Sequence, residues 1–363
     1  MIFASITVLV ICFVFYYCIR AAKAPQLVFN NNRINQKIVS SLSRLHRPFK
    51  PTPWAFNSHL QLIVLVVKEF FSTPLRYDRV EVIGMEDGGT TGLCWVGDGL
   101  AEDSPIIVVL HTINGTPQSM SQLVDDLHRF TGWKTVLCVR RGHGDINFTT
   151  PKYNSMGDTN DLRAQLDTIS ARFPCAPLYM LGSSAGSGLL VRYLGEPEVN
   201  DQVKGAFAYC PGYDISIAFQ RSHDFYSRLM AKKLVKNFVE PNRHLFQSKT
   251  NLSQLLNAEN LHDFHQHLFA VAGFESHDHY LEHINPVTVM DNIRIPIMVL
   301  NSEDDPVCVL QNVLEYKRSL ESMEKSILVI TKRGSHCAHL TGWLAQSWSH
   351  QLAADYFKAL EQL

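Results

Sequence analysis

The sequence predicts an α/β fold in which a mostly parallel sheet is flanked by helices. Continuous apolar runs, such as residues 105–110 and 135–140, are typical of strands that are buried on both faces. Amphipathic stretches such as residues 158–173 separate the later runs, and this alternation is typical of parallel sheets. With 363 residues, 46% of them hydrophobic, the chain is long enough to bury one large core, or at most two.

The N-terminal segment, residues 1–19, has no charged side chain and matches the length of a membrane-spanning helix. A signal peptide is the alternative, but the uncharged start and Pro25, directly after the only small-x-small site, favour an anchor. We therefore expect a single-pass protein of the endoplasmic reticulum or plasma membrane, in either orientation. Residues 20–68 carry only basic charges, which indicates a juxtamembrane linker and helix that is solvated or rests on anionic headgroups.

Residues 69–363 are expected to form the globular domain. Alternating apolar and polar residues predict a hairpin over 78–85 and 90–97. Further strands are expected at 105–110, 135–140, 177–182, 203–210, 295–301 and 326–331. The last helix is expected from about Trp343 onward. The interval 211–292 is rich in helix formers and aromatic residues without a convincing strand, so we expect a helical cap over the sheet edge.

Residues 181–188, LGSSAGSG, contain a Gly-x-Ser-x-Gly pattern between a predicted strand and a predicted helix. This is the pattern of a nucleophile elbow, in which the serine occupies a strained turn and the glycines avoid collisions. A phosphate loop would need a lysine, and a dinucleotide-binding loop would need another glycine spacing. An ordinary small-residue turn is the remaining alternative. We predict Ser184 as the nucleophile.

A serine nucleophile needs a base, and in this architecture an acid and a histidine follow it in the order Ser, Asp, His. Asp304 and Asp305 lie in a loop after the strand at 295–301, and the residues alone leave both open. His336 follows the next strand and directly follows a Gly-Ser pair, which favours it over His339. Asp214 is a further candidate for the acid.

Acyl transfer also needs hydrogen-bond donors for an oxyanion. The backbone N–H of Ala185, after the nucleophile, is one candidate, and the loop after the strand at 105–110 offers that of Thr112 or Ile113. His111 is expected to brace this loop. The turn at 140–145, RRGHGD, is also expected to brace the active-site loops.

No cofactor, metal or nucleic acid is predicted. The 33 basic and 34 acidic side chains nearly cancel, which argues against a nucleic-acid footprint. Eight cysteines are scattered without a CxxC pair, which indicates buried thiols. The cap histidines lack accompanying cysteines or paired carboxylates, so we interpret them as surface or interfacial side chains. They are His262, His265, His267, His277, His279 and His283.

Several motifs together resemble the membrane-anchored α/β-hydrolases typified by the bacterial YheT-like proteins and their abhydrolase-domain relatives. They are HTING, RRGHGD, the segment around LGSSAG, FESHDHYLEH, NSEDDP and RGSHCAHL, and the resemblance runs from about Pro53 to the C-terminal helix. It implies an α/β-hydrolase fold and a triad of Ser184, Asp305 and His336, with Asp304 as the alternative acid. Thr112 and Cys337 stand where the family pattern differs, so the resemblance does not specify the substrate range.

The resemblance implies a serine hydrolase that cleaves carboxylic esters of acyl lipids, of the phospholipase, acylglycerol lipase or carboxylesterase type. With an alcohol acceptor, the same triad would make an acyltransferase. A non-catalytic lipid-binding scaffold is the alternative from another class. The partners expected are a lipid ester and a membrane bilayer, and nothing indicates an oligomeric state.

Overall fold

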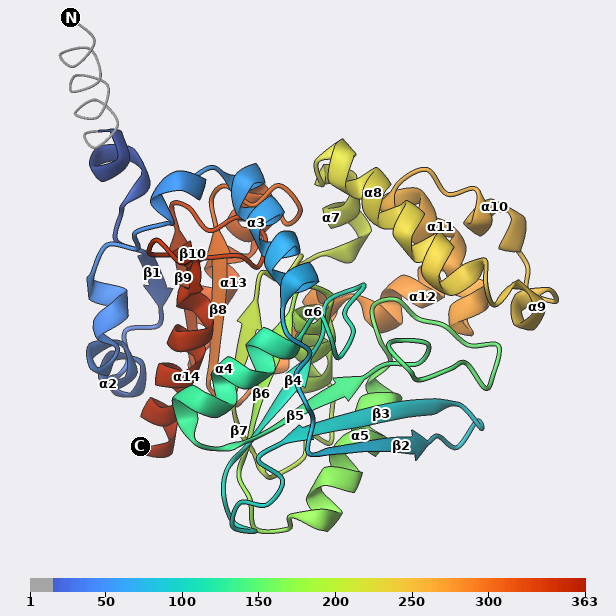
Figure 1. Ribbon diagram of the computed structural model, residues 1–363, viewed down its shortest axis with the longest axis horizontal. Coiled ribbons are helices and arrows are strands. Elements are labelled where there is room, and N and C mark those ends of the chain that lie inside the picture. The colour runs from blue at the N-terminus through green and yellow to red at the C-terminus, as the bar shows by residue number, and fades with distance from the viewer. Residues whose placement is uncertain (1–15) are drawn as a thin grey trace, which may run out of the picture.

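The computed structural model describes residues 16–363, and its centre is a nine-stranded sheet (Figure 1). The strand order is β1-β9-β8-β7-β6-β4-β5-β3-β2. The strands of this sheet are β1 (Gln26–Phe29), β2 (Arg79–Gly84), β3 (Thr90–Val96), β4 (Ile106–Leu110), β5 (Lys134–Val139), β6 (Leu178–Ser183), β7 (Val203–Tyr209), β8 (Ile297–Ser302) and β9 (Ser326–Thr331). A separate pair, β10 (Leu340–Thr341) and β11 (Gln346–Ser347), forms a small hairpin.

Strands β5, β4, β6, β7, β8 and β9 run parallel, whereas β1, β2 and β3 join the two edges antiparallel. Every residue of β4, β5, β6, β8 and β9 is buried, as strands covered on both faces require. The predicted α/β fold with a mostly parallel sheet is confirmed. Parallel strands direct their carboxyl ends to one edge, and there the loops that carry chemistry gather.

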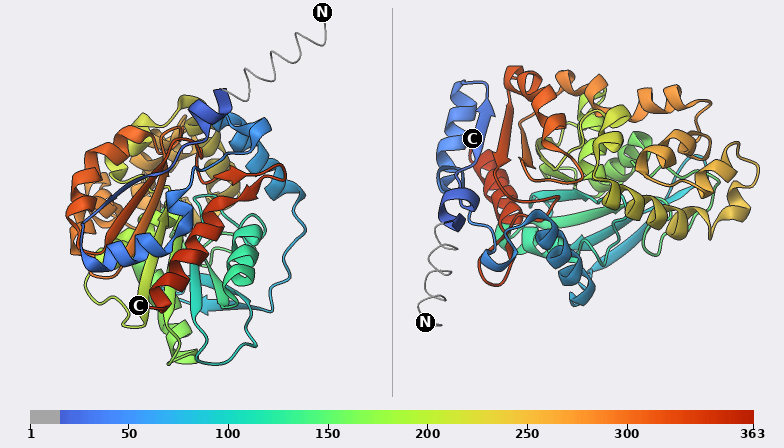
Figure 2. Two further views of the ribbon diagram at one scale, coloured as in Figure 1. Left: turned by 90° about the vertical axis from the view of Figure 1, so that its left-hand side faces the viewer. Right: turned by 90° about the horizontal axis from the view of Figure 1, so that it is seen from above.

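Helices cover both faces of the sheet (Figure 2). One face packs against α5 (Thr159–Arg172), α6 (Ala185–Gly195) and α13 (Leu310–Ser322). The other packs against α2 (Arg33–Ser41), α4 (Ser121–Thr131) and α14 (Trp348–Glu361). The shorter helical turns are η1 (Tyr17–Ala21), η2 (Ser43–His46), η3 (Pro53–Ala55), η4 (Val235–Val239), η5 (Pro286–Thr288) and η6 (Met290–Asn292).

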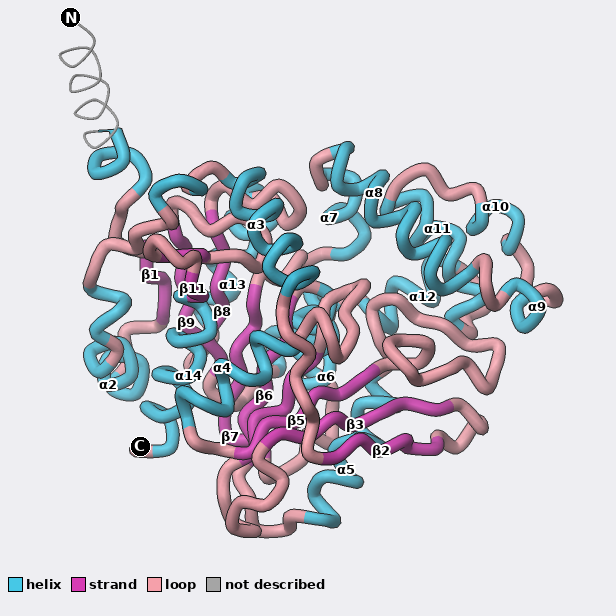
Figure 3. The backbone as a smooth tube through the Cα atoms, in the orientation of Figure 1, coloured by secondary structure: helices cyan, strands magenta, loops and turns pink. Residues whose placement is uncertain are grey.

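Between β7 and β8 the chain is helical, and this segment covers the carboxyl edge of the sheet (Figure 3). Its helices are α7 (Ile215–Arg221), α8 (Asp224–Leu234), α9 (Arg243–Phe246), α10 (Leu252–Leu256), α11 (Leu261–Ala272) and α12 (His277–Ile284). They share a hydrophobic cluster that also includes Ile113 and Met156 from the loops below and Ala185, the first residue of α6. The helical segment is therefore packed directly onto the loop that carries Ser184.

The basic segment at 20–68 contributes to the fold. Strand β1 pairs with β9, and α2 buries Ile38 and Val39 in the core. No alternation in the sequence marks β1, because it has only four residues. The helix expected in this segment is α3 (Ser58–Phe71), which contains the apolar run at 60–67.

The expected anchor, residues 1–19, lies mostly outside the described residues. Within residues 16–363, no helix has both the length and the apolar character needed to cross a bilayer. After η1 the backbone becomes extended at Ala22, with ψ of 95°, and the chain soon enters β1. The single-pass N-terminal anchor is therefore not supported by the structure, and the expected membrane localisation, which rested on it, is wrong on this finding.

Candidate active site

The turn between β6 and α6 presents Ser184 at the carboxyl edge of the sheet. Ser184 has φ 52° and ψ −116°, which L-residues rarely adopt, and its amide donates a 2.8 Å hydrogen bond to the Tyr209 carbonyl. A Cβ on Gly182 would lie 2.3 Å from the carbonyl oxygen of Gly186, and one on Gly186 would lie 2.2 Å from that of Leu110. Glycine is therefore needed at both positions for the backbone to make this turn.

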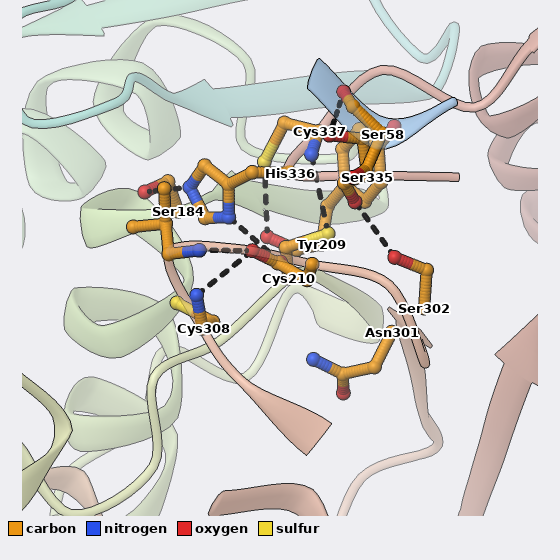
Figure 4. Close-up of polar contacts among 12 residues, drawn as sticks. Ser58, Ser184, Tyr209, Cys210, Asn301, Ser302, Cys308, Ser335, His336 and Cys337 are labelled. Carbon is orange, nitrogen blue, oxygen red and sulfur yellow. Dashed lines mark hydrogen bonds and ion pairs between the residues drawn. The ribbon is translucent and has the colours of Figure 1, made fainter. Parts of the chain in front are cut away.

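Three side chains from three loops, Ser184, His336 and Asp305, form a hydrogen-bonded chain at this edge. Figure 4 labels the first two. The Ser184 hydroxyl donates to Nε2 of His336 over 2.8 Å. Nδ1 of His336 donates to Oδ2 of Asp305, also over 2.8 Å. The other oxygen of Asp305 accepts the amide hydrogens of Val307 at 2.7 Å and Cys308 at 2.8 Å. The Asp305 side chain is fully buried and has a fixed orientation, so it fixes the imidazole ring as well.

Asp305 also controls the protonation of His336. Burial by itself lowers the pKa of an imidazole, but the Asp305 carboxylate reverses this and raises the pKa of His336 well above 6.5. The higher pKa makes the neutral imidazole a stronger base toward the Ser184 hydroxyl.

The alternative acids have other partners. Oδ1 of Asp304 accepts the amide hydrogen of Ser335 at 2.9 Å, so this carboxylate braces the loop that carries His336. Asp214 caps helix α7, where its Oδ1 accepts the amide hydrogen of Ser216 at 3.0 Å. Of the three aspartates considered from sequence, Asp305 is the one that hydrogen-bonds His336.

The alternative base, His339, is buried behind the site. Its ring bonds the hydroxyl of Tyr209 at 3.0 Å and that of Thr331 at 2.9 Å, and burial lowers its pKa to about 3. A neutral ring held between two hydroxyls is a structural element of the loop.

The candidate oxyanion donors lie beside Ser184. Within residues 16–363, the amide N–H groups of Ala185, Thr112 and Ile113 have no hydrogen-bond acceptor, so they are available to a ligand. Ala185 and Ile113 line the same pocket as Ser184, and Thr112 does not.

The loop after β4 is held by the basic turn that follows β5. The Arg140 guanidinium donates to the carbonyl oxygen of Thr112 at 2.6 Å, and Nε2 of His143 bonds that of Ile113 at 3.1 Å. The Arg140 amide donates to Nε2 of His111 at 3.1 Å. In a trans peptide the C=O and the following N–H point in opposite directions. Fixing the Thr112 carbonyl therefore fixes the direction of the Ile113 N–H.

A pocket beneath the helical segment adjoins Ser184. Its lining is almost entirely apolar and contains no acidic or basic side chain. The lining residues are Ile113, Met156, Ser184, Ala185, Gly188, Gly212, Ile215, Ala218, Phe219, Met230, Leu261, Val307 and Cys308. The arrangement places a hydroxyl, a base and free amide donors beside a small apolar pocket.

Helix α3, the turn before it and the loop between β10 and β11 expose many apolar side chains. The ammonium of Lys68 on α3 donates to the Ala345 carbonyl, and the Trp54 indole donates to the Trp343 carbonyl at 3.0 Å, which joins the segments. Large side chains face solvent here. They are Trp54, Leu60, Ile63, Val66, Val67, Phe70, Phe71, Trp343 and Leu344. His59, near the start of α3, bonds the hydroxyl of Tyr226 on α8 at 2.7 Å.

Sequence reasoning missed three cysteines near His336. The sequence predicts Cys210, Cys308 and Cys337, with the other five cysteines, only as buried thiols, and Cys337 in addition as a departure from the family pattern. All three follow strands at the carboxyl edge, which is the signal that could have drawn attention to them.

The comparisons with known proteins agree with this geometry. The model of the family described as "Serine aminopeptidase, S33" matches residues 101–340. Embryogenesis-associated protein EMB8 from Picea glauca is 27% identical over 94% of this chain and 78% of its own length. Phospholipase ABHD3 from Homo sapiens is 24% identical, over 93% and 85%. Monoacylglycerol lipase ABHD2 from Homo sapiens is 23% identical, over 93% and 86%.

Among solved structures, the esterase Pf2001 from Pyrococcus furiosus superimposes with a TM-score of 0.51 at 15% identity. The match covers 79% of this chain and 92% of that one. At this identity the similarity shows the fold, and it agrees with the parallel sheet and flanking helices described above.

Proposed function

The chain belongs to the serine aminopeptidase (S33) family of α/β-hydrolases and is an ester hydrolase, and on that premise we propose that it cleaves esters of acyl lipids. The observation that carries the proposal is the hydrogen-bonded chain of Ser184, His336 and Asp305 beside an apolar pocket. We assign these three residues as the catalytic triad.

In the proposed reaction His336 takes the proton of the Ser184 hydroxyl through Nε2 as the serine oxygen attacks the ester carbonyl. Asp305 stabilises the imidazolium that forms. His336 then donates the proton to the leaving alcohol, which leaves the acyl group on Ser184. A water molecule, deprotonated by His336, releases the fatty acid and restores the enzyme.

Two backbone amides stabilise the oxyanion in this mechanism. The first is that of Ala185. For the second we choose Ile113 over Thr112, because the Arg140 bond to the Thr112 carbonyl directs the Ile113 N–H away from Arg140, and Ile113 lines the pocket. The basic turn thus supports catalysis by orienting the loop.

The pocket supports an acyl chain as the bound group. An aminopeptidase must hold a charged α-amine, and among the described residues no carboxylate lines the pocket beside Ser184. Burial of each methylene group contributes about 0.8 kcal/mol, so an apolar lining favours an apolar acyl group over a charged one. The relatives include a phospholipase and a monoacylglycerol lipase, and both names agree with this substrate class.

The exposed apolar side chains of α3 are consistent with a substrate that reaches the enzyme from a lipid aggregate. Phe70 is 79% exposed, Phe71 77% and Leu344 79%, and exposed patches of this kind mark contacts with lipids or proteins. We propose that this surface contacts the lipid phase, which is the bilayer partner expected from sequence. The narrower YheT-like affiliation and the helical cap at 211–292 also remain proposals. The domain expected at 69–363 includes β1 and α2 in addition, because both pack into its sheet and core.

Labelling with a fluorophosphonate probe tests the assignment of the nucleophile. Wild-type protein is expected to be labelled and Ser184→Ala to remain unlabelled, with Ser183→Ala, the neighbouring serine, as the matched control. A folded wild-type protein that takes no label would favour the scaffold alternative. Release of fatty acid from lipid esters, with and without an added alcohol, then separates hydrolysis from acyl transfer.

A further inference from the structure

Three thiols gather around the catalytic imidazole (Figure 4). Cys210 directly follows β7, Cys308 lies beyond the turn that carries Asp305, and Cys337 follows His336 in the chain. Residues up to 127 positions apart in the sequence thus meet at the carboxyl edge of the sheet.

The tightest group consists of Cys210, Cys337 and His336. One donor atom from each, a sulfur from each cysteine and a ring nitrogen from the histidine, lie within 4.8 Å of one another. The Cys337 amide donates to Sγ of Cys210 at 3.4 Å, which ties the two loops together. Cys210 is fully buried and Cys337 is 9% exposed. Both have positive φ, 51° and 55°, and neither is a glycine.

The contacts of the Cys337 thiol are weak. It donates to the Tyr209 carbonyl over 3.8 Å and accepts from the Ser183 hydroxyl at 3.5 Å. Its sulfur therefore has little to lose when it takes another partner.

The donor set matches one class of metal ion. Thiolate sulfur and imidazole nitrogen are the ligands that Zn²⁺ prefers, at about 2.3 Å and about 2.0 Å in tetrahedral geometry. Tetrahedral angles at these lengths separate two sulfurs by about 3.8 Å. The three donor atoms are within 4.8 Å before any metal is added, so closure needs a movement of about 1 Å. Two thiolates balance the charge of Zn²⁺, so the buried site would be neutral.

We propose that Cys210, Cys337 and His336 form an inhibitory binding site for Zn²⁺. Binding releases the two thiol protons to solvent and forms two Zn–S bonds and one Zn–N bond, and water occupies the fourth position. The enzyme in this state is inactive, because both ring nitrogens of His336 are used by the triad. A metal on Nε2 displaces Ser184, and a metal on Nδ1 displaces Asp305. The inhibition rests on the proposed function, whereas the binding does not.

A second group, Asp305, Cys308 and His336, also has donor atoms within 4.8 Å of one another. It offers only one sulfur, and its carboxylate already accepts two amide hydrogens at 2.7 and 2.8 Å. We therefore place the metal on the pair of thiols. A disulfide between Cys210 and Cys337 is the competing outcome in an oxidising solution, and the experiment separates it by its response to a reductant.

Cobalt binding tests the site without reference to any substrate. Full-length protein, kept reduced and freed of metal, is titrated with Co²⁺, whose thiolate complexes absorb in the near ultraviolet. We expect one equivalent to bind with thiolate-to-cobalt absorption and Zn²⁺ to displace it. Cys210→Ser and Cys337→Ala should each weaken binding at least about 100-fold, since loss of outer contacts alone weakens metal sites by about 10- to 100-fold. Cys175→Ser, an exposed thiol before β6, is the matched control.

Zinc inhibition is measured in parallel on a soluble short-chain ester, with each variant's activity in EDTA as its own reference. We expect EDTA to reverse inhibition of wild-type protein and the two cysteine variants to escape inhibition. The proposal is overturned if wild-type protein shows no thiolate-to-cobalt absorption. It is also overturned if both cysteine variants show the same absorption as wild type. It is equally overturned by inhibition that a reductant, and not EDTA, reverses. Protein without ester activity that still binds cobalt through both cysteines would refute the proposed function alone.

Discussion

Replacement of Asp305 by asparagine probes the catalytic chain with almost no change in shape. The Asp305 Oδ1 atom accepts two backbone amide hydrogens, so the asparagine must keep its oxygen on that side. Its NH₂ group then faces Nδ1 of His336, where the carboxylate oxygen now lies at 2.8 Å. Two donors cannot share a hydrogen bond, so the imidazole is forced to carry its proton on Nε2. In that tautomer it cannot accept the proton of Ser184.

The size of the loss follows from the same distance. Unit charges 2.8 Å apart, at an effective dielectric constant of about 20, attract with about 6 kcal/mol. This energy stabilises the imidazolium formed in the transition state. Its removal corresponds to a fall in kcat of about 10⁴-fold.

The measurement is kcat on a short-chain ester, with circular dichroism and thermal unfolding to show that the variant is folded. Asp304→Asn is the matched control, because its carboxylate bonds the Ser335 amide and does not reach His336. We expect the control to retain activity within about 10-fold of wild type. If Asp305→Asn retained activity and Asp304→Asn lost it, the assignment of the acid would be reversed.

Three more predictions follow from the geometry. The pKa of His336 is raised well above 6.5, and only the neutral ring is a base, so kcat/KM should rise with pH through a midpoint above 6.5; a lower midpoint would contradict this. Gly186→Ala should prevent soluble expression, because its Cβ would lie 2.2 Å from a β4 carbonyl oxygen, whereas Gly188→Ala, with 3.4 Å to its nearest neighbour, should fold. Burial raises the pKa of Glu69 from 4.5 to about 7, so ionisation destabilises the fold as pH rises. Glu69→Gln should therefore stabilise the protein by about 2–3 kcal/mol at pH 8 and hardly at pH 4.5 in urea unfolding. Equal effects at both pH values, or the same gain from the exposed control Glu86→Gln, would refute the assignment of the titrating group.

The sheet could be predicted from sequence because strands buried on both faces must be apolar throughout. The same rule fails at β1, whose four residues lie at an edge and within a basic segment. Helix α3 illustrates a different limit. Its apolar run at 60–67 exposes Ile63 and Val66 instead of burying them. Sequence hydrophobicity does not say which side chains a helix turns toward the core.

The site could be predicted in part because a local pattern specifies the turn around Ser184. Asp304 and Asp305 are neighbours whose side chains diverge, one to the Ser335 amide and one to the imidazole, and no property of either residue separates them. The choice between Thr112 and Ile113 depends on a guanidinium from another loop. The thiols near His336 depend on backbone conformations that favour glycine but occur here at cysteine.

The loop that carries His336 explains why catalysis and metal binding would share one support. Ser335, Cys337 and His339 have φ of 55°, 55° and 39°, so every second residue is left-handed, and such residues cost about 1–3 kcal/mol each. Buried hydrogen bonds offset the strain: the His339 amide donates to the Gly334 carbonyl at 2.8 Å, and its ring is held by Tyr209 and Thr331. A backbone so constrained cannot move His336 without also moving Cys337. Any ligand that engages this thiol therefore acts on His336, the proposed catalytic base.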